Sequence, residues 1–143
     1  MSLLNQVQDD VNAALKAGDR ERVHALRLIV DALQKAEKDN GGDPVEILQR
    51  ERKRRLEAAE AYREGGRIDS AEAEEREAEV IVSYMPEQLS DEELHAIVGD
   101  AIAGSGASSP QELGKVMALV MPHVKGRADG KRVSAAAKEM LTP

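Results

Sequence analysis

Helix start and stop signals recur along the whole chain, and they leave little room for other secondary structure. Residues of the types that cap helix N-termini stand before six apolar stripes with three-four spacing. These residues are Ser2, Asp19, Asp43, Ser90, Ser109 and Asp129. No bounded run with a period of two is present, so no strand is predicted. The chain is therefore expected to be all-α.

Four helices are predicted before residue 86. Glycine ends the first and the third of them, because helices commonly stop at glycine. Asn40-Gly41-Gly42 separates the second helix from the third. The expected bounds are Ser2 to Gly18, about Arg20 to Lys38, Asp43 to Gly65, and roughly Ser70 to Tyr84.

A change of character at Met85-Pro86 predicts a domain boundary, because the residue before a proline is driven out of helical geometry. Three short helices are expected beyond it, and Pro122 is expected to stop the second of these. The apolar stripe of the last helix includes Met140 and Leu141. The predicted organisation is an extended N-terminal helical domain, residues 1–85, followed by a compact C-terminal three-helix bundle, residues 86–143.

Composition excludes several classes of site and protein. The chain of 143 residues has no Cys, Phe or Trp, so a disulfide framework, a thiolate metal site and a cysteine nucleophile are excluded. The three His are scattered without metal-ligand spacing, and no metal or cofactor is predicted. The N-terminus lacks the basic region of a signal peptide, and no apolar run approaches the roughly 20 residues of a membrane helix. A cytoplasmic protein without membrane contact is expected.

A basic segment between residues 115 and 132 contrasts with the net charge of −7 of the whole chain. It contains five basic residues and one acid, a local balance of +4. A cationic patch on an acidic protein is a candidate anion-binding surface. Glycine in its turn allows a backbone to approach phosphate closely, and a helix N-terminus disfavours the cations that stand there. The candidate nucleic-acid-binding residues are Lys115, Lys125, Gly126, Arg127, Lys131 and Arg132. An ordinary solvated surface is the alternative interpretation.

A second basic run covers residues 50–55 within the long polar third helix. Consecutive residues fan around a helix axis, so this run cannot form one narrow stripe. Glu46 and Arg50 stand four positions apart, as do Glu51 and Arg55, which predicts two ion pairs that support the helix. A solvated helix face is the favoured interpretation; an auxiliary RNA contact or a partner surface is the alternative.

No catalytic residue is predicted. Carboxylate pairs such as Glu74-Glu75 and Glu92-Glu93 point in different directions on a helix and have polar neighbours. Nothing there would raise a pKa by burial, as a general acid requires. The chain has no nucleophile elbow, phosphate loop or dinucleotide fingerprint, and His24 is expected to be a surface residue.

Five segments along the chain resemble the GatB/YqeY family, specifically its small stand-alone YqeY-type proteins. The matching segments are 2–4, 26–29, 84–90, 114–117 and 124–130. Residues from about 86 onward resemble the tail domain of the B subunit of the aspartyl/glutamyl-tRNA amidotransferase. In that family the tail is a helical module that contributes to tRNA binding, while transamidation takes place elsewhere in the complex. Ala118 and Ser134 depart from the family pattern, which often has glycine and asparagine there.

The resemblance implies a non-catalytic helical protein that binds tRNA or another structured RNA by backbone contacts. Near-absence of aromatic residues argues against a stacking platform for single-stranded bases. Two alternatives stay open. The chain could be a component of a glutamine-dependent tRNA amidotransferase, a carbon–nitrogen ligase with glutamine as amide donor, or a helical protein–protein adaptor. Expected partners are tRNA and amidotransferase or aminoacyl-tRNA synthetase components.

Overall fold

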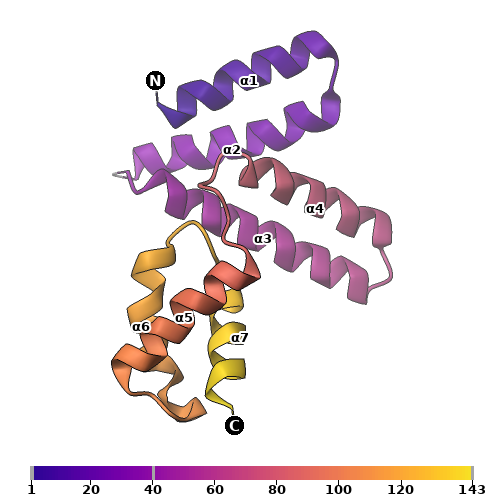
Figure 1. Ribbon diagram of the computed structural model, residues 1–143. Coiled ribbons are helices and arrows are strands. Elements are labelled where there is room, and N and C mark those ends of the chain that lie inside the picture. Colours follow the sequence, from indigo (N-terminus) through magenta and orange to yellow (C-terminus); the bar gives the residue numbers. More distant parts are fainter. Residues whose placement is uncertain (1, 40, 143) are drawn as a thin grey trace. The chain divides into compact units, whose positions relative to one another are not determined.

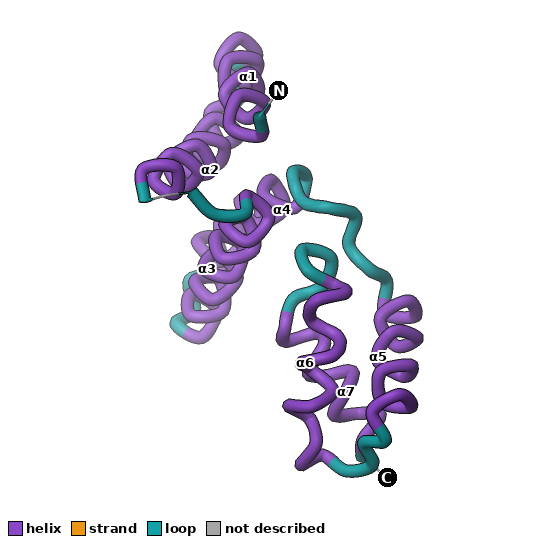
Figure 2. Tube along the Cα trace, turned by 90° about the vertical axis from the view of Figure 1, so that its left-hand side faces the viewer, coloured by secondary structure: helices purple, strands orange, loops and turns teal. Residues whose placement is uncertain are grey.

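The computed structural model describes residues 2–39 and 41–142, so Met1, Pro143 and the Asn40 of the expected chain break lie outside the described residues. The described residues form α-helices, one short 3-10 helix and no strand (Figure 2). The predicted all-α class is confirmed. The elements are α1 (Leu3–Ala17), α2 (Arg20–Lys38), α3 (Pro44–Glu64), α4 (Ile68–Val82), α5 (Asp91–Ser105), η1 (Pro110–Glu112), α6 (Leu113–Val124) and α7 (Gly130–Leu141).

Contacts between residues divide the chain into two compact units, Met1–Met85 and Pro86–Pro143. The first unit consists of two helical hairpins, α1 with α2 and α3 with α4 (Figure 1). Helices α3 and α4 also pack on α2. The main buried cluster of this unit draws on all four helices through Val7, Val11, Ala14, Val23, Leu26, Ile29, Leu33, Ile47, Leu48 and Ile81.

Side-chain caps begin the first three helices at the positions that the sequence indicates. The Ser2 hydroxyl accepts a hydrogen bond from the Asn5 N–H at 3.1 Å, and Asp19 accepts one from the Arg22 N–H at 3.1 Å. Asp43 accepts one from the Val45 N–H at 2.9 Å. Each bond satisfies a backbone donor that the helix itself leaves unpaired.

Helix α4 begins at Ile68 and ends at Val82, so the predicted bounds, Ser70 and Tyr84, are each wrong by two residues. Gly66 adopts a φ of +77°, and the Arg67 N–H donates to the Tyr62 carbonyl at 2.8 Å. This tight turn reverses the chain at once, and α4 starts without a side-chain cap. At the start of α4 a short turn therefore takes the place of the capping side chain from which a helix start is predicted.

The second unit packs α5, α6 and α7 around one core (Figure 1). Its buried residues are Leu89, Leu94, Val98, Ala107, Val116, Val120, Val124, Ala128, Val133, Ala136, Ala137 and Leu141. Met140 was expected on the buried stripe, but 41% of it is exposed. Its methyl group lies 3.1 Å from the place where a Cβ on Gly99 would stand, so Met140 covers the edge of α5.

Pro122 lies inside α6 and does not end it, contrary to the prediction from the sequence. A proline inside a helix removes one hydrogen bond, here the bond to the carbonyl of Ala118. Ala118 is exposed, so water can reach that carbonyl. Two residues after the proline, Val124 is fully buried in the core. Burial of Val124 offsets the lost bond and keeps the helix going for another half turn.

Candidate nucleic-acid interface

The turn between α6 and α7 carries half of the predicted nucleic-acid-binding residues. Gly126 is buried and has a φ of +78°, a conformation that favours glycine. The N–H groups of Arg127 and Ala128 donate to the Val124 carbonyl at 2.8 and 3.1 Å, which closes the end of α6. Asp129 then accepts a bond from the Arg132 N–H at 2.8 Å and starts α7.

The first residues of the second unit lie along this turn. We name residues 86–91 the strap; they end at the first residue of α5. Within it the Gln88 amide donates to the Gly126 carbonyl at 2.7 Å and to the Pro86 carbonyl at 2.9 Å. The Leu89 N–H donates to the Arg127 carbonyl at 2.9 Å, and the Leu89 side chain is buried. Hydrogen bonds to the Gly126 and Arg127 carbonyls, together with burial of the Leu89 side chain, therefore fix the turn.

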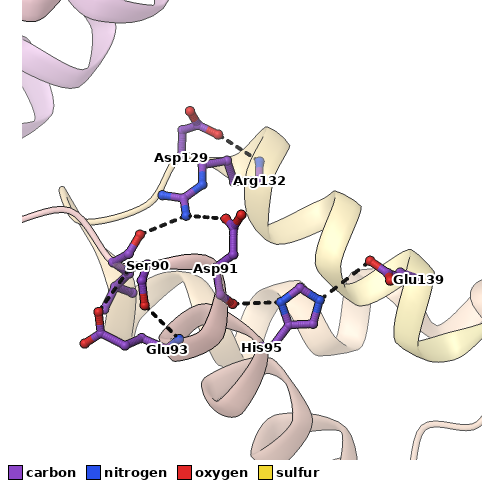
Figure 3. A network of polar contacts seen from close by, with 8 residues as sticks. Ser90, Asp91, Glu93, His95, Asp129, Arg132 and Glu139 are labelled. Atoms are coloured by element: carbon purple, nitrogen blue, oxygen red, sulfur yellow. Dashed lines mark hydrogen bonds and ion pairs between the residues drawn. The ribbon is translucent and has the colours of Figure 1, made fainter.

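The guanidinium groups of two arginines of the predicted interface donate hydrogen bonds to the strap. Arg127 Nε donates to the Glu87 carbonyl at 3.1 Å. One terminal nitrogen of Arg132 donates to the Leu89 carbonyl at 2.8 Å and to Asp91 Oδ1 at 2.9 Å (Figure 3). Such charge-assisted bonds are stronger than bonds between neutral groups. Arg127 and Arg132 are therefore holding the strap in place.

The six candidate residues fall into two groups. Lys125, Gly126 and Arg127 occupy the α6–α7 turn, and Lys131 and Arg132 follow in the first turn of α7. Lys115 stands near the start of α6, about 15 Å along the helix axis from Lys125. All three lysines are exposed. The structure thus brings five of the six candidates together at one end of the unit and places Lys115 towards the other end of α6.

Carboxylates share this end of the unit with the basic residues. Glu93 completes the capping box of α5: it accepts from the Ser90 N–H at 3.1 Å, and the Ser90 hydroxyl accepts from the Glu93 N–H at 3.1 Å (Figure 3). These bonds lower the pKa of Glu93, and the charge of Arg127 contributes in the same direction. Residues 86–143 hold six basic and eight acidic residues, a net charge of −2. The exposed lysines therefore belong to a unit that is acidic overall.

His95 connects α5 with α7 beside the strap. Its Nδ1 lies 2.7 Å from the Asp91 carbonyl, and its Nε2 lies 3.6 Å from a carboxylate oxygen of Glu139 (Figure 3). The Asp91 carbonyl raises the pKa of His95, and Glu139 adds to the shift. Protonation of this histidine therefore strengthens the link between the two helices.

The second basic run, residues 50–55, takes part in ion pairs within the first unit. Glu51 pairs with Arg55 at 3.3 Å, as predicted, and with Arg54 at 3.2 Å. Arg55 also pairs with Glu77 of α4 at 3.3 Å. Burial, and then the charge of Glu74, raise the pKa of Glu77. This arrangement ties α3 to α4 and agrees with a structural interpretation of Arg55. The predicted pair of Glu46 with Arg50 stays a prediction.

Residues 2–39 and 41–142 contain neither a cluster of metal ligands nor a membrane-spanning helix. No three His, Asp or Glu side chains among them stand close enough to hold a metal ion. Within the same residues, no helix has the length and apolar character to cross a membrane.

Sequence reasoning missed the strap. Gln88 and Asp91 form bonds with residues 38 and 41 positions further along the chain, and a local pattern carries no sign of such partners. One signal was present: residues 84–90 and 124–130 both belong to the motifs of the family resemblance. In the structure, Glu87, Gln88 and Leu89 of the first segment bond to Gly126 and Arg127 of the second.

Comparison with known proteins assigns the family. A search of curated proteins gives no match. A family model described as Yqey-like protein matches residues 4–141, nearly the whole chain, including the strap and the turn that it holds. The chain belongs to the YqeY family.

Proposed function

We propose that this YqeY-family protein is a non-catalytic RNA-binding protein that holds tRNA, or another folded RNA, through exposed lysines of its second unit. The observation that supports this most is the firm attachment of the α6–α7 turn. Lys125 opens that turn, Lys131 follows it, and both side chains are exposed. The strap fixes the backbone between them through Gly126 and Arg127.

Attachment of the turn lowers the cost of binding. When the backbone of the binding loop is already ordered, less conformational entropy of the protein is lost on binding than when the ligand must order the loop. Lys131 stands at the N-terminal end of α7, where the helix dipole gives a cation no support but favours an anion such as phosphate. The position therefore suits a lysine that serves a ligand.

Folded RNA fits this surface better than single-stranded RNA. The chain has two tyrosines and neither phenylalanine nor tryptophan, and the Tyr84 hydroxyl donates to Asp10 within the first unit. Stacking of unpaired bases is therefore little supported, and contacts to phosphate and ribose on a folded RNA remain. Because the unit has a net charge of −2, binding is expected to be weak and sensitive to salt.

A gel-shift titration of the full chain with unfractionated tRNA at low salt tests this proposal. The double variant Lys125→Ala/Lys131→Ala is expected to bind several-fold more weakly and to show a shallower dependence on salt, since each lost phosphate contact reduces the salt slope by about one. Arg127 and Arg132 are left unchanged because they hold the strap.

Lys138→Ala is the matched control, since Lys138 is an exposed lysine in the last turn of the same helix. It should bind tRNA as the wild type does. Equal binding by the double variant and the wild type would remove Lys125 and Lys131 from consideration. The two narrower hypotheses, an amidotransferase component and a protein adaptor, stay predictions.

A further inference from the structure

A groove of about 490 Å³ lies in the first unit where α1 ends and α2 begins. Its volume is in the range of ligand-binding clefts. Leu15 stands at this groove with half of its surface exposed. The apolar lining consists of Ala14, Leu15 and Val23, and the basic lining consists of Arg20, His24 and Arg27.

The basic lining forms one stripe of α2. Arg20, His24 and Arg27 stand at helix positions i, i+4 and i+7, so they share a face and span about 10 Å. Neither the Arg20 nor the Arg27 side chain makes a hydrogen bond or ion pair with another described residue. The one acid among the described lining residues, Asp19, already caps α2 through the Arg22 N–H. The two arginines therefore offer unneutralised charge to a ligand.

A neighbouring groove of about 600 Å³ between α2 and α4 gives a useful contrast. It also contains basic residues, but acids of the same groove stand against them. Arg76 lies 3.7 Å from Glu21, and His24 lies 3.4 Å from Glu77. Arg20 lines both grooves, but its side chain and that of Arg27 form no ion pair with a described residue, whereas the side chains of Arg76 and His24 do.

We propose that the groove between α1 and α2 binds an acidic peptide segment of a protein partner. In this arrangement an apolar side chain of the segment rests on Leu15, while its carboxylates meet Arg20 and Arg27. Charge complementarity selects the partner, because exposed cations on a unit with 14 basic and 19 acidic residues attract a negative segment locally and fix its register.

A peptide fits this groove better than a nucleic acid or a small metabolite. The phosphate backbone of RNA has no apolar group to place on Leu15. Small-molecule sites usually enclose their ligand among fixed polar groups. Among the described residues, no polar or charged side chain is classed as buried, and the arginines of the groove are exposed. A peptide in a helical or extended conformation can bind such an open surface through a few of its side chains.

Fluorescence anisotropy of the full chain with a dye-labelled peptide tests the proposal. The probe is an amphipathic peptide of leucine and glutamate, and its partner probe replaces every glutamate with glutamine. The wild type is expected to bind the acidic probe saturably and the glutamine probe much more weakly. The double variant Arg20→Glu/Arg27→Glu should lose about tenfold or more in affinity, because two favourable charge pairs become repulsive. Leu15→Ser should weaken binding independently of charge.

Lys53→Glu is the control, since it makes the same charge change as each single arginine substitution, at an exposed residue of α3 outside the groove lining. It should bind the acidic probe within about twofold of the wild type. Circular dichroism of each variant checks that the helices remain. Absence of saturable binding by the wild type, equal binding of the glutamine probe, or an equal loss in the control would overturn the proposal. Displacement of the probe by tRNA would assign the groove to RNA instead.

Discussion

Gly126 is buried and has a left-handed backbone, and the two properties together make it hard to replace. A side chain at a φ of +78° costs about 1–2 kcal/mol. We expect Gly126→Ala to lower the free energy of unfolding by about that amount, measured by urea titration with circular dichroism. Gly104→Ala is the control: this glycine lies in α5 with open space around its Cβ position. It should leave stability unchanged or raise it by up to about 1 kcal/mol.

Arg132 and Lys131 are neighbours with different duties. The guanidinium group of Arg132 bonds the strap at the Leu89 carbonyl and at Asp91, whereas the Lys131 side chain is exposed. Arg132→Ala should destabilise the protein by about 1–2 kcal/mol, because a carbonyl of a buried residue loses its donor. Lys131→Ala should stay within about 0.5 kcal/mol. Hydrogen exchange at the Leu89 amide is expected to accelerate only in the Arg132 variant; acceleration in both would contradict these roles.

Helices are the part of this molecule that could be predicted from the sequence, because the signals that start and stop them are local. Asp19 and Asp129 cap helices one residue later, and each bond reaches only three positions along the chain. Pro122 shows the limit of such signals. Its local effect is to end a helix, but burial of Val124 in a core formed by distant residues outweighs that effect.

The sequence indicates where the candidate site lies, but it does not indicate which of its basic residues are exposed and which bond to the strap. A cluster of positive charge is visible in the sequence, and five of the six candidates do lie at one end of the second unit. Whether a basic side chain is exposed or bonded to another segment depends on contacts some 40 residues apart, such as that of Arg127 with Glu87. Charge patterns do not contain that information.

The link between α5 and α7 at His95 should depend on pH. Folding raises the pKa of His95 above its usual value of 6.5, so the folded state binds the proton more tightly. The resulting stabilisation is complete below pH 6.5 and is lost as the pH rises through the folded pKa. We expect His95→Ala to destabilise the protein more at about pH 6 than at about pH 9 in thermal unfolding. An equal effect at both values would show that the proton does not matter.

Each of the two units has a core made from its own residues. The buried cluster of the second unit runs from Leu89 to Leu141, and that of the first from Val7 to Ile81. Domains of 55–65 residues often fold alone when they bury one good core. A fragment of residues 86–143 is therefore expected to give a helical circular-dichroism spectrum and a cooperative thermal transition. A spectrum typical of an unfolded chain would show that residues 1–85 are needed.

The strap affects the order in which the two units can fold during translation. A protein leaves the ribosome with its N-terminus first, and each domain folds once it has been synthesised. The bonds that anchor Gln88 and Leu89 require Gly126, Arg127 and Arg132, which are translated about 40 codons later. Nascent chains that already contain the four leading helices can fold that part, while the beginning of α5 must wait. Translation has to pass Arg132 before the second unit can close around the strap.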